Sequence, residues 1–598
     1  MTLPVFPATV KAATPAEHAA WHNEIHTRLA ESPAQPTNIV VTDSGHLAAH
    51  DAICSYLNTN YGTTFPTTHN ELDPNHLQEH IDIHAMVEWN YAVLILTSDS
   101  NSAAQTKINN AASNAVVGFQ GGTHFERKVT ARLGQTYRGD PRGTTVLDGS
   151  RAITSWSGNG PWTASHTIAD RGVFIDTTGV RTATGDDIGA QYPEELFFET
   201  PGANSGWTRK TRKGQPTTGA PGAGQWTMDY SSGTLKVAES PIGKNVRISV
   251  TDTAIAAPAL AAGGLTIEDI TFQKYATDLW HSAAGHGADH RDWTYRRVSM
   301  IDSHGSGFYL GPGDTVERCR SMYQGQDGFD GEGEVAGGYF NNRTIIDTEV
   351  GYNKQARYDW GWGGGGSKFD MPPSGSGLTI RNCWWHHNFG PAIWTDLNET
   401  ETSTITIESN LVESNLINGI FIEIGNNPTL IRWNTVLNCN DGSISPNGGP
   451  LPDDESCAGI DISNSRNCTV QQNKVIDCPT GIMIRDDGRD PFLDGANVTG
   501  NHVRLKSGSN GNTVKFRPDA SNARIATCGA DNNKYWNPLS LSYNNVFGMS
   551  FAAWQAARSG PGLTGALDPN GQAGLTGTVT DPVSFVPFVL KRYGPGMD

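Results

Sequence analysis

Acidic and aromatic residues recur at equivalent positions in short, glycine-containing β-rich segments between residues 305 and 485. Two of these segments read GPAIWTDL and NGIFIEI. Side chains alternate between the two faces of a β-strand. The aliphatic residues of these segments therefore face a core, and Trp394 and Asp396 lie on the opposite, outward side of the strand. The same alignment places Phe421 and Glu423 outward in the following segment. We therefore predict that Asp396 and Glu423 are exposed neighbours on adjacent strands.

Paired carboxylates of this kind can perform acid–base chemistry. Parallel strands stack about 4.8 Å apart, and like charges that close raise one pKa, which leaves an ionised base or nucleophile beside a protonated acid. Glycoside hydrolysis needs this pair, with carboxyl groups about 5–5.5 Å apart in retaining enzymes and about 6.5–9.5 Å apart in inverting ones. The spacing between strands allows the retaining separation. Side chains that diverge from one another, or Asp370 as a third acid, allow the inverting separation. The alternative interpretation is a solvated acidic face or a bound cation.

Lys368 and Asp370 complete the predicted catalytic group, although their segment, WGWGGGGSKF, can slip by one residue. Lys368 could pair with the acids, orient a sugar, or act as the base of a β-elimination, which would make the protein a polysaccharide lyase. A lyase acting on uronic acids needs cations or a metal to neutralise the substrate carboxylate, whereas the outward column is mostly acidic. A neutral glycan is therefore the favoured substrate.

Tryptophan is concentrated around these acids. Five of the sixteen tryptophans lie within 35 residues, and flat indole faces stack on sugar rings. An aromatic stack inside the protein is the alternative for any one of them, but Trp394 and Phe421 fall on the outward column. The predicted substrate-binding residues are Trp394, Phe421, Trp360, Trp362, Trp385, Glu332 and Asp461.

Repeats from about residue 264 predict the fold. Each unit has a short β-rich stretch, often an Asn, a second stretch, then Gly and alternating apolar residues. Such units with a period in the twenties are typical of a β-solenoid, because each coil buries its apolar edge only against the next. The LxxLxL frame of a leucine-rich repeat is absent. We predict an all-β, right-handed parallel β-helix, with a recurrent Asn stacking at a turn at Asn382, Asn410, Asn434, Asn473 and Asn501.

Several segments resemble those of bacterial β-helix proteins in the pectate-lyase-like superfamily, over about residues 92–560. They are GTHFERKVTARLGQTYRGDPRGTTVLDGSRAI, EELFFET, GQWTMDYSSGTLKVAESPIGKNVRISV, WGWGGGGSKF, GPAIWTDL and NGIFIEI. The superfamily includes lyases, glycoside hydrolases, epimerases and adhesins, so the resemblance implies the fold more than the chemistry. Its recurrent WTD and GIFxEI motifs correspond here to Trp394, Thr395, Asp396 and Glu423. Where the pattern has an acid after GW, this chain has Gly363.

Three regions are expected: a helical attachment region over 1–90, the β-helix with inserted loops over 91–545, and a cap and tail over 546–598. Thr14 caps a first predicted helix, and a second runs from about His46 to Tyr61. These helices resemble the N-terminal regions of tail proteins of actinobacterial phages. The resemblance implies a virion tail protein, tailspike-like, that contacts other tail proteins and a host cell-surface polysaccharide as a homotrimer. A non-catalytic receptor-binding or structural tail protein is the alternative.

Composition restricts the other partners. The 598 residues carry a net charge of −18, and nucleic-acid binding instead needs a clustered basic surface. No window approaches 18 consecutive apolar residues, and the first residues lack a signal-peptide pattern, so we expect no membrane insertion and synthesis in the host cytoplasm. Two triplets with i, i+4, i+8 spacing, at His18, His22 and His26 and at His76, His80 and His84, could bind a metal, but packing is favoured. We expect no cofactor and no metal.

The eight cysteines show no CxxC pair and are expected to be mostly buried thiols. Cys439 and Cys478 occupy the same place in successive repeats and are expected to stack or pair. Near the C-terminus, FAAWQAARSG is predicted to form a short helix that covers the last coil.

Overall fold

The computed structural model describes most of the chain from residue 91 onward. The described residues are 51, 53–55, 57–59, 86, 91–140, 144–166, 192–201, 206–213, 220–258, 264–278, 280–285, 290–331, 342–356, 365–370, 377–397, 404–426, 428–439, 457–489, 493–507, 512–518, 527–537, 539–543, 549–556, 567–582 and 585–589. Residues 51, 53–55 and 57–59 are helical, within the second predicted N-terminal helix. The first predicted helix and both His triplets lie outside the described residues.

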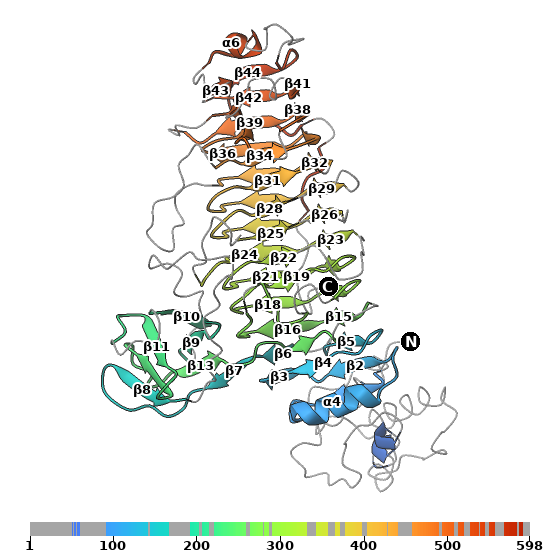
Figure 1. Cartoon of the computed structure of the whole chain (residues 1–598), viewed down its shortest axis with the longest axis vertical. Helices are drawn as coiled ribbons and strands as arrows, with labels where there is room; N and C mark the ends of the chain where they lie inside the picture. The colour runs from blue at the N-terminus through green and yellow to red at the C-terminus, as the bar shows by residue number, and fades with distance from the viewer. Residues whose placement is uncertain are drawn as a thin grey trace, which may run out of the picture.

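Three parallel sheets wind around one long core and stack coil upon coil (Figure 1). The first sheet consists of β1 (Val93–Ile95), β2 (Val116–Phe119), β5 (Thr136–Arg138), β15 (Thr266–Glu268), β17 (Thr294–Arg296), β20 (Thr315–Glu317), β23 (Arg343–Ile346), β26 (Leu378–Arg381), β29 (Ile405–Glu408), β32 (Thr429–Arg432), β35 (Cys468–Gln471), β38 (Asn497–Thr499) and β41 (Gly529–Asp531). The second consists of β3 (Gly122–Phe125), β6 (Thr145–Asp148), β16 (Ile270–Gln273), β18 (Ser299–Ile301), β21 (Arg320–Met322), β24 (Glu349–Gly351), β27 (Trp384–His386), β30 (Leu411–Glu413), β33 (Thr435–Leu437), β36 (Lys474–Cys478), β39 (His502–Leu505), β42 (Lys534–Trp536) and β44 (Gln572–Leu575).

The third sheet carries the predicted column of acids and aromatics. It consists of β19 (Phe308–Tyr309), β22 (Phe329–Gly331), β25 (Ser367–Asp370), β28 (Ile393–Asp396), β31 (Ile420–Gly425), β34 (Ile460–Ser465), β37 (Ile482–Asp486), β40 (Val514–Pro518) and β43 (Leu541–Tyr543). Ile393, Ile420, Ile460 and Ile482 align at one inward position, and all four are fully buried. Burying each isoleucine contributes about 1.5–3 kcal/mol, so this repetition fixes the register of the sheet.

An asparagine ladder joins the coils at the turn between the first and second sheets. Each side-chain amide except the last donates to the amide oxygen of the next Asn at 2.9–3.0 Å and also to a backbone carbonyl. The ladder runs through Asn410, Asn434, Asn473, Asn501 and Asn533, and all five are fully buried. A second ladder links Asn353, Asn388 and Asn415.

Asn382 was predicted as the first member of the longer ladder, and this prediction is wrong by one residue. The backbone N–H of Cys383 donates to Asn410 Oδ1 at 2.9 Å, so Cys383 occupies the ladder position. Asn382 instead takes a left-handed φ of 55° and donates from its side chain to Asp347. Asn favours both roles, which is why its recurrence alone could not set the register.

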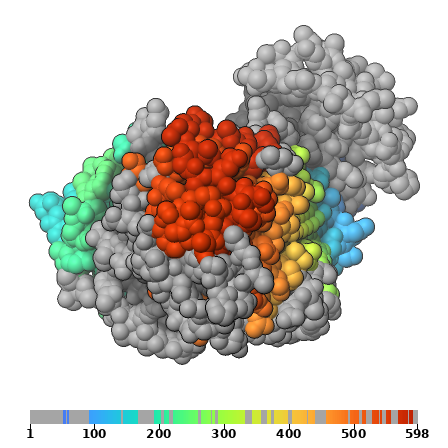
Figure 2. Space-filling view, turned by 90° about the horizontal axis from the view of Figure 1, so that it is seen from above, coloured from blue at the N-terminus to red at the C-terminus, as the bar shows by residue number. Residues whose placement is uncertain are grey.

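Residues 150–249 include a separate seven-stranded sheet that projects from one side of the solenoid (Figures 1 and 2). The segments EELFFET and GQWTMDYSSGTLKV, expected as stations of the β-helix, belong to this sheet. Its order is β7 (Ser150–Ala152), β13 (Asn245–Ser249), β9 (Leu196–Glu199), β10 (Trp207–Arg212), β11 (Gln225–Asp229), β12 (Thr234–Val237) and β8 (Trp162–Ser165), and only the β10–β11 pair is parallel. It has its own core, which includes Phe198, Trp226 and Leu235.

Polar contacts attach this inserted sheet to the solenoid. His304 Nδ1 lies 2.8 Å from Glu195 Oε1, and Arg209 donates to the backbone oxygen of Tyr323 at 2.8 Å. His304 and Glu195 are almost fully buried, so the contact is part of the folded structure rather than a solvated surface pair. β4 (Val129–Thr130) and β14 (Ile255–Ala256) form a separate two-stranded parallel sheet.

Short helices cover the two ends of the solenoid (Figure 1). Helix α4 (Asn101–Asn110), which was not predicted from the sequence, contributes Ala104 and Ile108 to the core at the first coil. Helix α6 (Phe551–Ala556) buries Trp554 against Phe516 and Tyr535 at the other end, which confirms the predicted cap. The chain then adds β44 to the second sheet, a strand that was not predicted.

All eight cysteines are buried and stay outside any disulfide, as expected. Cys439 and Cys478 meet through a hydrogen bond between their thiols, and this bond and burial raise the pKa of Cys478. The two residues therefore stack rather than form a disulfide.

Candidate functional site

Strands β25, β28 and β31 bring the four predicted catalytic residues together. Trp394 pairs in register with Phe421, and Thr395 pairs with Ile422, so Asp396 and Glu423 are the next residues along the two strands. On the other side, Asp370 pairs with Asp396. The predicted register of the WGWGGGGSKF segment is therefore correct at Lys368 and Asp370.

The predicted exposure of this column is wrong. Asp396 and Glu423 are only 7% and 9% exposed, and Trp394 is 3% exposed, although all three side chains point away from the hydrophobic core. A contact that covers Glu423 comes from the turn after β37, where an Arg489 guanidinium nitrogen lies 2.6 Å from Glu423 Oε1. Strand alternation predicts which side of a sheet a residue faces, but it does not predict what covers that side.

Asp396 is held by a cation and a backbone donor. Lys368 Nζ lies 3.3 Å from Asp396 Oδ2 and 3.8 Å from Asp370 Oδ1, so the lysine bridges the two acids. The backbone N–H of Leu397 donates to Asp396 Oδ1 at 2.8 Å. These donors fix the position of the Asp396 carboxylate and favour its ionised form.

Glu423 has a different set of partners. Trp394 Nε1 donates to Glu423 Oε2 at 3.1 Å, while Arg489 approaches the other carboxylate oxygen. Arg489 also lies 3.2 Å from Asp487, and its side chain is 40% exposed. Glu423 is thus bonded on one side by a buried indole and on the other by an arginine that reaches solvent.

Burial and like charges raise the pKa of both acids above the ordinary carboxyl value. For Asp396, burial and Asp370 raise the pKa, while Lys368 opposes them. For Glu423, burial is again the main cause, and Asp396 raises the pKa further against Arg489 and Arg485. Burial lowers the pKa of Lys368, but Asp370, Asp396 and Glu423 outweigh it and the net shift is upward. The lysine therefore stays protonated near neutral pH.

Trp394 and Phe421 do not offer free ring faces to a sugar, contrary to the predicted role as stacking platforms. The two rings stack on each other, with centroids 5.4 Å apart and planes at 28°. Lys368 Nζ lies 4.2 Å from the Trp394 ring centroid, and the Arg485 guanidinium lies 5.5 Å from that of Phe421. The aromatic pair is enclosed between two cations, which such rings attract through their negative faces.

Trp385 is also excluded as a substrate contact. It belongs to β27 of the second sheet and is fully buried in the core, with its ring 5.8 Å from that of Phe329. Alternation in the pair Trp384 and Trp385 permits either residue to face inward, and the sequence did not decide between them. Trp360, Trp362 and Glu332 lie outside the described residues.

Asp461 follows Phe421 in the column and is fully buried. It accepts from Arg485 Nε at 3.2 Å. Burial raises the pKa of Asp461 to about 6 despite this arginine. This arrangement makes Asp461 a buried ion-pair partner and not a substrate-exposed group.

Three groups near the column were not predicted from the sequence. Asp487 and Arg489 lie in the turn after β37, where Asp487 pairs with both Arg485 and Arg489. Asp327 lies in the turn before β22 and is 1% exposed; burial raises its pKa well above the ordinary value against the opposing charges of Lys354 and Lys368. The Asp–Gly step in QDGFDG was the available signal for Asp327, but it reads equally well as a turn.

Within the described ranges, no group of three or more His, Cys, Asp or Glu side chains is arranged to hold a metal ion. The described helices also include none that is long and apolar enough to span a membrane.

A family model described as "Right handed beta helix region" matches residues 285–450, the part of the solenoid that holds the site. The solenoid is a right-handed parallel β-helix. Among solved structures, this β-helix is similar to XylC in complex with xylose, with 11% identity, a TM-score of 0.53, and coverage of 75% of this chain and 85% of that one. At that identity the likeness concerns the fold alone.

Two further solved β-helix structures resemble the chain less well. The A-module of the mannuronan C-5 epimerase AlgE4 from Azotobacter vinelandii is 10% identical, with a TM-score of 0.44 and coverage of 75% of this chain and 96% of that one. Tailspike protein 3 of bacteriophage CBA120 is 10% identical, with a TM-score of 0.36 and coverage of 82% of this chain and 69% of that one. No curated protein sequence matches the chain.

Proposed function

We propose that the protein hydrolyses a glycosidic bond in a neutral or weakly charged polysaccharide, with Glu423 as the acid and Asp396 as the nucleophile or base. The observation that carries the proposal is the pair of buried carboxylates at the same position of two adjacent strands. Each has a raised pKa and a different set of hydrogen-bond donors. Lys368 next to Asp396 favours its ionised form, whereas the charge of Asp396 favours protonation of Glu423. This division of protonation is what glycoside hydrolysis requires.

A lyase reaction is the less favoured chemistry. Its base would have to lose a proton near neutral pH, and the pKa of Lys368 is shifted upward by three acids. The same lysine is 3.3 Å from Asp396, so deprotonating it would leave that carboxylate without its cation. Lys368 is better suited to hold Asp396 in place.

A second candidate function is glycan binding without cleavage. It is favoured by the two ion pairs, Lys368 with Asp396 and Arg489 with Glu423, because each holds an acid in its charged form. Cleavage requires Arg489 to leave Glu423, and its 40% exposed side chain leaves room for that movement.

The products separate these functions. Cell-envelope polysaccharide from actinobacteria would be incubated with the full chain. New reducing ends without ultraviolet absorbance support hydrolysis, whereas absorbance of an unsaturated uronate supports a lyase. Retention on the polysaccharide without products supports the binding function. If the full chain neither cleaves nor retains any of the polysaccharides, both glycan functions are wrong.

The biological setting that we propose is a phage tail, in which residues 1–90 attach the protein to other tail proteins and the β-helix meets the host surface as a homotrimer. This proposal is supported by the resemblance of the TPAEHAAWHNEIHTRLAES and GHLAAHDAI segments to tail proteins of actinobacterial phages. Light scattering of the full chain tests the trimer, and a monomer mass at micromolar concentration would contradict it.

A further inference from the structure

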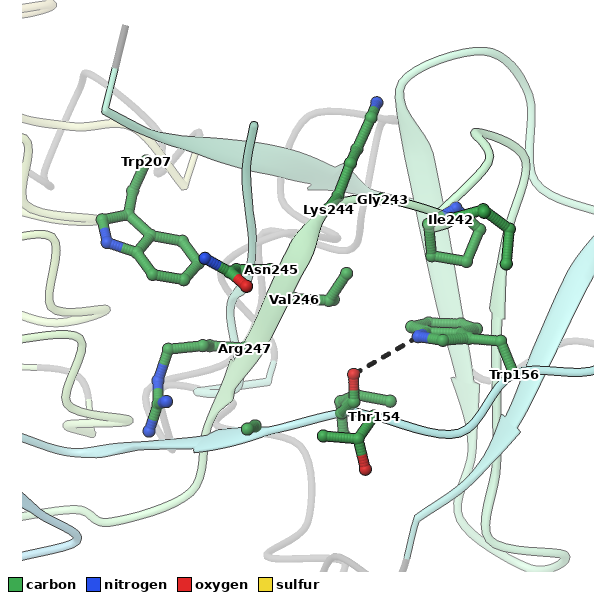
Figure 3. A pocket seen from close by; sticks show the side chains of 12 residues that line it. Thr154, Trp156, Trp207, Ile242, Gly243, Lys244, Asn245, Val246 and Arg247 are labelled. Carbon is green, nitrogen blue, oxygen red and sulfur yellow. Dashed lines mark hydrogen bonds between the residues drawn. The ribbon is translucent and has the colours of Figure 1, made fainter. Parts of the chain in front are cut away.

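The inserted sheet contains a pocket that is separate from the carboxylate pair. It lies beside the edge formed by β7 and β13 and has a volume of about 510 Å³ (Figure 3). Pockets that bind small ligands have volumes of about 300–1,000 Å³. The inserted sheet leaves the solenoid at the level of β6 and β16, several coils from the β28 and β31 strands that hold the acids (Figure 1).

Two tryptophans form opposite walls of this pocket. The indoles of Trp156 and Trp207 stand on either side of Asn245 and Val246 (Figure 3). Trp156 Nε1 donates to the backbone oxygen of Ile153 at 3.3 Å, and Lys274 Nζ of the solenoid lies 4.8 Å from the Trp207 ring centroid. Both indoles are only half-buried, so they are held in place and yet accessible from the pocket.

The two cations of the lining are engaged elsewhere. Lys244 forms an ion pair with Glu239, and Figure 3 shows its side chain directed away from the pocket. Arg247 donates to the hydroxyl and the backbone oxygen of Ser150, and its guanidinium lies 4.0 Å from the Phe125 ring centroid. Among the described residues that line the pocket, none carries a carboxylate. The pocket therefore presents neither an available cation nor an acid as its main recognition group.

The remaining polar groups are neutral. The exposed Thr154 provides a hydroxyl, and Asn245 provides an amide that is oriented by a 2.8 Å bond from its Nδ2 to Glu199 Oε2. Hydroxyl and amide groups exchange hydrogen bonds with sugar hydroxyls, and the negative faces of indoles attract the C–H groups of a sugar ring. We propose that this pocket binds a neutral oligosaccharide, as a second glycan site on the inserted sheet that does not depend on the carboxylate pair.

Calorimetric titration of the full chain with cellotetraose and xylotetraose tests this proposal, with tetragalacturonate as the acidic comparison. At least one neutral tetrasaccharide is expected to bind, and Trp207→Ala is expected to weaken its affinity at least tenfold. Ile242→Glu gives a second test, because Ile242 lines the pocket and is 65% exposed, so its replacement is expected to leave the fold intact. It is expected to weaken the same affinity.

Two controls define the site. Trp433→Ala removes a half-buried tryptophan of the solenoid, and Asp396→Asn with Glu423→Gln removes the paired acids; binding should persist in both. Absence of binding by both neutral probes, tighter binding of tetragalacturonate, or unchanged affinity in Ile242→Glu would overturn the proposal. If Trp207→Ala lowers the thermal midpoint, the Ile242→Glu result decides.

Discussion

The indole N–H of Trp394 donates a 3.1 Å hydrogen bond to the carboxylate of Glu423, one coil away on the neighbouring strand. The tryptophan is therefore a structural partner of the proposed acid. A donor to the charged form of a carboxyl lowers its pKa, so this bond opposes the upward shift that burial imposes on Glu423.

Replacing Trp394 with Phe should keep the aromatic stack on Phe421 and remove only the N–H donor. The pKa of Glu423 is expected to rise, because the charged form loses a hydrogen-bond donor. If Glu423 is the acid, activity is lost as pH rises through this pKa, so the alkaline limb of the pH–rate profile should move to higher pH. Trp384→Phe is the matched control, because it removes an indole donor to Glu413 outside the site. An unchanged alkaline limb in Trp394→Phe would contradict this role.

Replacing Lys368 with Met should raise the pKa of Asp396, because the lysine is the cation that opposes burial there. Asp396 must be ionised to act as nucleophile or base, so the acidic limb of the profile should move to higher pH. Lys474→Met removes the same charge from a surface pair with Asp581 and should leave the profile unchanged. Equal profiles for Lys368→Met and the wild type would show that Lys368 does not control Asp396.

Asp461 predicts a pH dependence of stability. Its pKa in the folded protein is about 6, above the ordinary 3.8, so the folded state binds the Asp461 proton more tightly than the unfolded state does. The stability that this proton contributes is fully present below pH 4 and is lost as pH rises through 6. The Asp461→Asn variant cannot titrate at this position. Its free energy of unfolding minus that of the wild type should therefore be larger at pH 7 than at pH 4, by up to about 3 kcal/mol, which means that the variant is relatively more stable at pH 7. Urea unfolding at the two pH values measures the difference. The same relative stability at both would mean that Asp461 does not titrate in this range.

The buried asparagine ladder should be a large contributor to stability. Asn434→Ala removes the side-chain acceptor of the Asn410 amide and the side-chain donor to the Asn473 amide oxygen and to the carbonyl of Ile407. We expect a loss of about 3 kcal/mol in the free energy of unfolding, because each buried polar group left unpaired costs about 1–3 kcal/mol. Asn497→Ala, at an exposed strand position, should change stability by less than about 0.5 kcal/mol. Equal losses in the two variants would contradict the role of the ladder.

The sequence was sufficient for the repeating part of the fold, because alternation and glycine spacing set which residues of β28 and β31 face the core. The pairing of Trp394 with Phe421 and the neighbouring positions of Asp396 and Glu423 follow from this pattern alone. Asn382 shows the limit: a recurrent residue can occupy two adjacent turn positions, and only the hydrogen bond from Cys383 to Asn410 distinguishes them.

Features that depend on non-repeating segments could not be predicted. The ion pair between Arg489 and Glu423 depends on the path of one turn after β37, which no periodicity encodes. The inserted sheet is a similar case, because Leu196–Glu199 and Gln225–Asp229 are short β-strands like those of the solenoid, yet they have partners within residues 150–249. Such contacts bury the column of acids and aromatics on the third sheet. For this reason the expectation of an exposed face was wrong.

Release of reducing ends from actinobacterial envelope polysaccharide tests the central claim most directly. The wild type should release them, whereas Asp396→Asn and Glu423→Gln should each lose at least a hundredfold in rate while keeping the thermal midpoint of a folded protein. Asp477→Asn, which removes a surface acid paired with Arg504, should retain full activity. Undiminished release of reducing ends by either site variant would contradict the assignment of Asp396 and Glu423 as the cleaving pair.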